Sequence, residues 1–181
     1  MNSAVTAHQP SAVDKTKIDQ GLELYKRQSS ALILNCMMLA GFEGSEINEF
    51  SPLYIHFMEM ALEYEFERLK VIKKYKEFGP KIASSKIKDF LNALNIRTTN
   101  NCKFEKLSKA MIRYRYDSCF IMVKCMTKAG FSSSDTEIYD HTYQYFLNKA
   151  INIEYVRCKN LRLTMLENVK GESKEKKQRV F

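Results

Sequence analysis

The sequence contains one stretch twice, at an offset of 89 residues. Residues 36–45 read CMMLAGFEGS, and residues 125–134 read CMTKAGFSSS. The similarity continues without a gap to residues 70 and 159, and 12 of the 35 aligned positions are identical. A single repeat at so long an offset is typical of a duplicated small domain rather than of a solenoid. The identical pairs include Tyr54 with Tyr143, Phe57 with Phe146, Ala61 with Ala150, Glu65 with Glu154, and Arg68 with Arg157.

The composition favours a globular helical protein. The chain has 181 residues, of which 45% are hydrophobic, with six glycines and three prolines. So few helix-breaking residues suit long helices better than a fold with many turns. No apolar run reaches the roughly 18 residues that a membrane span needs, and the N-terminus does not resemble a secretory signal. We therefore expect an all-α protein that does not enter a membrane.

Apolar residues spaced three and four apart predict the helices of each copy. In the first copy, a helix starting near Asp14 ends at Gly41, a longer helix covers 46–78, and a short third helix covers 86–95. In the second copy, a helix starting near Leu107 ends at Gly130, a long helix covers 135–166, and no clear third helix follows. The predicted division is a disordered lead-in (1–13), a first repeat (14–96), a linker (97–106), a second repeat (107–168) and a basic tail (169–181).

The order of short helix, long helix and short helix resembles the histone fold. The resemblance rests on the long central helix and on the closing segment KIASSKIKDFLNAL at 81–94. Within that class, the Ala-Gly-Phe ending of the first helix at 40–42 is similar to the TBP-associated factors of general transcription complexes. The resemblance covers 22–96, and 107–165 through the repeat. It implies two tandem histone-fold-like halves and a non-enzymatic nuclear protein that pairs with histone-fold subunits.

A histone fold buries the apolar side of its long helix only against a second copy, so both long helices need a partner. Two arrangements remain open at this stage. The two halves clasp each other within one chain, or they pair with a histone-fold subunit of another chain. The candidate partner-binding residues are Phe50, Tyr54, Phe57, Ala61, Tyr64, Tyr139, Tyr143, Phe146, Ala150 and Ile153.

The sequence offers little for catalysis or for metal binding. His8, His56 and His141 are far apart, and none has a Cys or carboxylate at metal-ligand spacing. The sequence also contains no phosphate-binding loop and no nucleophile elbow. We therefore expect no enzymatic activity, no cofactor and no small-molecule substrate. We also expect a solvated acidic face on the first long helix, formed by Glu59, Glu63, Glu65 and Glu67.

The net charge of +8 suits a polyanionic partner. Because no pattern indicates base recognition, any DNA binding is expected to be non-specific and directed at phosphates. The candidate phosphate contacts are Lys70, Lys73, Lys74, Lys76, Lys81, Arg113 and Arg115. The basic tail is a candidate nuclear localisation signal through Lys174, Lys176, Lys177 and Arg179.

These observations leave three hypotheses for the function. The preferred one is a histone-fold subunit that pairs through its long helices to assemble a transcription-related nuclear complex. The second is a histone-like protein that binds DNA without sequence preference. The third is a duplicated helical-bundle adaptor of a virus or parasite, unrelated to histones.

Overall fold

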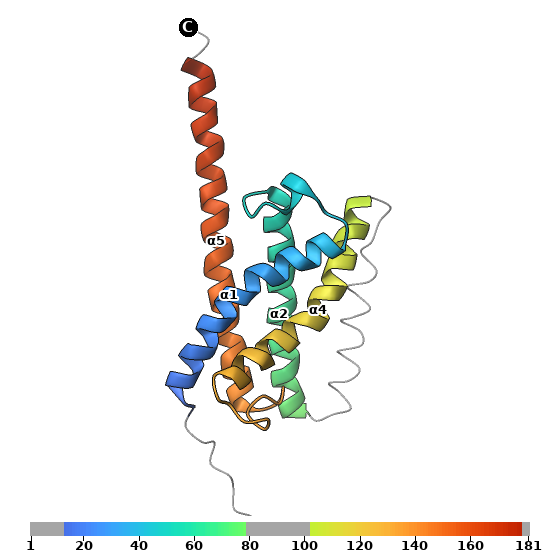
Figure 1. The fold of residues 1–181 in the computed structure, drawn as a ribbon, viewed down its shortest axis with the longest axis vertical. Coiled ribbons are helices and arrows are strands. Elements are labelled where there is room, and N and C mark those ends of the chain that lie inside the picture. Colours follow the sequence, from blue (N-terminus) through green and yellow to red (C-terminus); the bar gives the residue numbers. More distant parts are fainter. Residues whose placement is uncertain (1–12, 79–101, 179–181) are drawn as a thin grey trace, which may run out of the picture.

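The protein is all-α, as predicted, in a computed structural model that describes residues 13–78 and 102–178. The described ranges contain no strand and no helix that is long and apolar enough to cross a membrane. In Figure 1, the C-terminal part of α5 extends well beyond the other helices. The elements are α1 (Lys15–Leu39), the 3-10 helix η1 (Gly44–Ile47), α2 (Pro52–Phe78), α4 (Cys102–Lys128) and α5 (His141–Gln178).

The helix boundaries follow the 89-residue offset of the sequence. α1 ends at Leu39 and α4 at Lys128, while α2 begins at Pro52 and α5 at His141. Each helix also packs chiefly against its own counterpart, α1 against α4 and α2 against α5. The two halves of one chain are therefore arranged like the subunits of a symmetric dimer, in which one surface contacts its own copy.

Aromatic contacts in the core repeat across the two halves. Tyr25 of α1 meets Phe146 of α5 edge to face, with ring centroids 6.4 Å apart. The counterpart contact joins Phe57 of α2 to Tyr114 of α4 at 6.3 Å, again edge to face. All four side chains are buried. Because each contact joins one half to the other, the core belongs to both halves together.

α1 and α4 both end on a glycine with a left-handed backbone. Gly41 has φ 89° and Gly130 has φ 90°, a region that favours glycine because it has no Cβ. The next amide, of Phe42 or Phe131, donates back to a helix carbonyl over 3.1 Å in both halves. The predicted ends of the first helices are therefore confirmed, and both loops leave the helices in the same way.

The long helices begin later than predicted, at Pro52 and His141 rather than at 46 and 135. In the first half, the short η1 helix occupies part of the intervening segment, and the hydroxyl of Ser51 then accepts a bond from the Tyr54 amide over 3.1 Å. In the second half, the Asp140 carboxylate accepts from the Thr142 amide over 2.7 Å. These side chains satisfy amides at the start of each helix, which fixes where the helix begins.

Three predicted features of length and boundary are wrong. The first helices are not short, since α1 has 25 residues and α4 has 27. α4 begins at Cys102, inside the predicted linker 97–106, and its first turns contain the favourable Glu105–Lys109 pair. α5 continues to Gln178 through most of the predicted basic tail, where Lys, Glu and Gln favour a helix. The predicted third helix at 86–95 lies outside the described residues.

Candidate functional site at the boundary of the two halves

A buried ion pair on α2 makes the first polar link between the halves. Glu65 and Arg68 lie one helical turn apart, and Arg68 Nη2 is 2.6 Å from Glu65 Oε2. Arg68 Nη1 donates to the Tyr143 hydroxyl of α5 over 2.8 Å. The guanidinium also lies over the Tyr143 ring, 5.9 Å from its centroid. An α2 charge pair is thereby joined to the facing helix of the second half.

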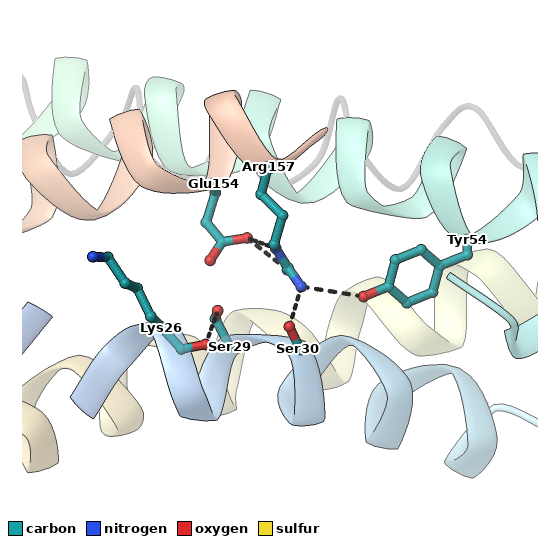
Figure 2. A network of polar contacts seen from close by, with 6 residues as sticks. All are labelled: Lys26, Ser29, Ser30, Tyr54, Glu154 and Arg157. Atoms are coloured by element: carbon teal, nitrogen blue, oxygen red, sulfur yellow. Dashed lines mark hydrogen bonds and ion pairs between the residues drawn. The ribbon is translucent and has the colours of Figure 1, made fainter. Parts of the chain in front are cut away.

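The same arrangement occurs in the opposite direction on α5 (Figure 2). Arg157 Nη2 is 2.6 Å from Glu154 Oε2, and Arg157 Nη1 donates to the Tyr54 hydroxyl of α2 over 3.4 Å. Arg157 Nη1 also donates to the Ser30 hydroxyl of α1. Beside it, the buried Ser29 hydroxyl donates to the carbonyl of Lys26 over 3.3 Å. The two networks therefore form a reciprocal pair across the boundary.

The paired glutamates keep both arginines charged, whereas burial keeps both tyrosines neutral. Burial lowers the pKa of Arg68, but the Glu65 carboxylate and the Tyr143 hydroxyl together raise it above the usual value. Burial raises the pKa of Tyr143 and of Tyr54, although the neighbouring arginine opposes that rise in each case. Largely buried charged pairs are costly to separate, so the two networks favour the pairing of the halves.

Between the two networks lies a small cavity with a volume of ≈ 10 Å³. This is far below the roughly 300 Å³ of the smallest usual ligand pockets. Glu65 is 3% exposed and Glu154 7% exposed, and the second carboxylate oxygen of each, Oε1, has no hydrogen-bond partner within the described ranges. The cavity is lined by Tyr25, Ile33, Met58, Ala61, Leu62, Glu65, Tyr114, Ile151 and Glu154.

The predicted partner-binding residues lie mostly between the two halves of this chain. Phe50 and Tyr139 are exposed because each precedes the start of its long helix, so their predicted inward orientation is wrong. Tyr64 and Ile153, at equivalent positions, are half-buried. The fully buried members are Tyr54, Phe57, Ala61, Tyr143, Phe146 and Ala150.

The predicted acidic face is wrong at Glu65. Of the four glutamates on α2 assigned to solvent, Glu65 is buried against Arg68. The sequence carried a signal for this, because Glu65 and Arg68 are both retained at the same spacing in the second copy, as Glu154 and Arg157. Glu63, by contrast, is exposed and has no identical counterpart. Identity between the copies therefore separates the buried acid from an exposed one.

The structure places the candidate phosphate contacts on two different helices. Lys70, Lys73 and Lys74 are exposed on α2, and Lys70 pairs with Glu67. On α4, the exposed Arg113 pairs with Asp117 over 2.6 Å, and Arg115 lies over the ring of Tyr64. The remaining candidates lie outside the residues whose side chains are described, namely Lys76, Lys81, Lys174, Lys176, Lys177 and Arg179.

Within the described ranges, no group of three or more His, Cys, Asp and Glu side chains could hold a metal ion. The four described cysteines are free, and burial raises the pKa of Cys36 to about 12. In comparisons with known proteins, no family model, curated protein or solved structure matches this chain.

Proposed function

We propose that the chain is a non-enzymatic assembly subunit whose two halves pair with each other and which binds a helical protein partner through α4. The surface concerned is an apolar stripe of three residues. Ile112 is 47% exposed, Tyr116 76% and Phe120 67%. Residues four apart lie on one face of a helix, so the three side chains form a continuous patch. A patch of this kind marks a protein interaction surface.

The observation that carries the proposal is a difference between the two copies. At the positions equivalent to Ile112, Tyr116 and Phe120, the first copy has Glu23, Arg27 and Ala31. Those three residues on α1 are also exposed, so the two faces differ in chemistry and not in burial. Since the pairing of the halves uses positions that are alike in both copies, the α4 stripe serves a purpose that this pairing does not require.

The charge of α4 indicates which partner fits the stripe. From 105 to 128 the helix carries six basic residues and two acidic ones. Two of the basic side chains near the stripe are paired on the helix itself, Lys109 with Glu105 and Arg113 with Asp117. Lys124 is exposed one turn beyond Phe120. An amphipathic helix with acidic residues beside its apolar face matches this pattern.

The nuclear, transcription-related setting follows from the resemblance to TBP-associated factors. In such complexes histone-fold subunits associate through their helices, and a chain that already contains both halves of a pair would enter the assembly as one unit. The long-helix residues predicted to pair either within the chain or with another subunit are mostly buried between the two halves of this chain. The outside partner therefore binds the exposed stripe instead.

A co-purification experiment tests this function. Tagged full-length protein is incubated with nuclear extract, and histone-fold subunits are identified by mass spectrometry. We expect such subunits with the wild type, and loss of most of them with the double variant Tyr116→Ala/Phe120→Ala. The matched control is Arg27→Ala at the equivalent position on α1, which should retain them. Absence of histone-fold subunits from the wild-type sample would contradict the setting, and equal retention by the double variant would contradict the surface.

DNA binding is the competing function, and the exposed Lys73 and Lys74 favour it. Binding of a random-sequence duplex, followed by fluorescence anisotropy at increasing salt, separates the two functions. Phosphate binding would weaken steeply with salt and would fall in the variant Lys73→Ala/Lys74→Ala. We expect no difference between this variant and the wild type, and loss of DNA binding in the variant would favour the DNA function.

A further inference from the structure

We infer that the cavity between the two ion pairs is a binding site for one internal water molecule. The water donates one hydrogen bond to Glu65 Oε1 and the other to Glu154 Oε1. Both oxygens are buried, both belong to side chains that line the cavity, and neither has a partner within the described ranges. A buried acceptor without a hydrogen bond is rare in proteins, and an ordered water commonly supplies the missing donor.

The size of the cavity fits a single water molecule. Its volume of ≈ 10 Å³ lies at the lower end of the roughly 10–15 Å³ that one water requires. A water also needs two to four polar partners, and the two carboxylate oxygens provide two acceptors. The remaining lining residues are aliphatic except for Tyr25 and Tyr114, whose hydroxyl groups are further hydrogen-bonding groups in the lining.

The charge around the cavity favours a neutral ligand over a metal cation. Each glutamate already has its own arginine, Glu65 with Arg68 and Glu154 with Arg157, at 2.6 Å in both pairs. The two pairs are therefore neutral, and a cation would add an uncompensated charge to the interior. Water satisfies the two orphan acceptors without changing the net charge.

The position of the water gives it a structural role. Glu65 lies on α2 and Glu154 on α5, so the water bridges the two halves. It also joins the Glu65–Arg68–Tyr143 network to the Glu154–Arg157–Tyr54 network. This role is independent of the proposed assembly function, because it concerns only the pairing of the halves.

Water magnetic relaxation dispersion on the full-length protein, together with a high-resolution crystal structure, tests this inference. The key variant is Ala61→Ser, which places a hydroxyl at the wall of the cavity. The matched control is Ala150→Ser, at the equivalent position in the second half, where the residue is buried but does not line the cavity. We expect the wild type and the control to show one more long-lived internal water than Ala61→Ser.

The crystal structure is expected to show one water within hydrogen-bond distance of both Oε1 atoms. Equal numbers of long-lived waters in the wild type and in Ala61→Ser would overturn the inference. A wild-type crystal structure with no density between the two carboxylates would also overturn it, as would a metal ion at that place. If Ala61→Ser does not fold, the wild-type crystal structure decides the question alone.

Discussion

Arg68 donates a hydrogen bond to the hydroxyl of Tyr143 over 2.8 Å, although the two residues belong to different halves of the chain. The equivalent bond runs the other way, from Arg157 to Tyr54, over 3.4 Å. Arg157 also donates a hydrogen bond to the Ser30 hydroxyl. The residue equivalent to Ser30 in the second half is Cys119, whose sulfur lies 3.5 Å from the Tyr143 hydroxyl. Duplication thus preserved the interface while allowing its periphery to diverge.

Removal of Arg68 is expected to destabilise the protein severely. In Arg68→Met the Glu65 carboxylate remains buried without its partner, which costs about 3–5 kcal/mol. In the double variant Glu65→Met/Arg68→Met the buried carboxylate is removed as well, so most of the lost free energy of unfolding should be recovered. Urea unfolding followed by circular dichroism measures both.

The control for this prediction is the exposed pair of Lys70 and Glu67 on the same helix. Lys70→Met should change the free energy of unfolding by no more than about 0.5 kcal/mol, because exposed pairs contribute little. If Arg68→Met were as mild as Lys70→Met, the first network would have no part in holding the halves together.

Gly21 provides a test of packing between α1 and α5. A Cβ at this position would lie 2.8 Å from Cε2 of Phe146. Overpacking outweighs the helix-forming advantage of alanine, so Gly21→Ala should lower the free energy of unfolding by about 1–2 kcal/mol. The same change in a Phe146→Leu background should cost less, because the clashing ring atom is absent. A double-mutant cycle measures the difference, and equal costs in both backgrounds would refute the contact.

The two helix-ending glycines should behave alike. A Cβ at Gly41 or Gly130 would come no closer than 3.7 Å to a side-chain atom, so space is not the obstacle. The obstacle is positive φ, which costs an alanine about 1–2 kcal/mol. We expect Gly41→Ala and Gly130→Ala to show similar losses in urea unfolding. Replacement by asparagine should cost less, because Asn adopts this backbone region more readily. A large loss in only one alanine variant would contradict the equivalence of the two loops.

Alkaline pH should weaken the fold through Cys36. Burial raises the pKa of this thiol from 9.0 to about 12, so it ionises in the unfolded chain first. Its contribution to stability is therefore complete below pH 9 and is lost as the pH rises toward 12, at up to about 1.4 kcal/mol per pH unit. Between pH 9 and 11, the free energy of unfolding should fall less steeply in Cys36→Ala than in the wild type. Urea unfolding at each pH under reducing conditions measures both. Identical slopes for the two proteins would show that the thiol does not govern this range.

The residues that were predicted correctly from the sequence include aromatic residues that are identical in the two copies. Tyr54 and Tyr143, with Phe57 and Phe146, are predicted to bind a partner, either the other half or another chain, and they are buried between the two halves. The apolar spacing placed these aromatic residues on the inward faces of the long helices. Their identity in the two copies indicated that both faces have equivalent surroundings. The all-α class followed from the same spacing and is confirmed.

The starts of the long helices and the burial of Glu65 were harder to predict from the sequence than the aromatic core. Phe50 continues the apolar spacing of α2, but the hydroxyl of Ser51 begins the helix after it. Glu65 shares its helix with several solvated glutamates, and periodicity cannot tell which acid faces an arginine in the core. The α4 stripe was also missed, since Tyr116 is recognisable only when it is compared with Arg27 at the equivalent position.

The mass of the folded protein in solution tests most directly whether the two halves clasp each other within one chain. Sedimentation equilibrium should give a monomer of 21.1 kDa across the micromolar range, with a urea midpoint that does not depend on protein concentration. A dimer of twice that mass, or a midpoint that rises with concentration, would show that the halves pair between chains and would contradict the account.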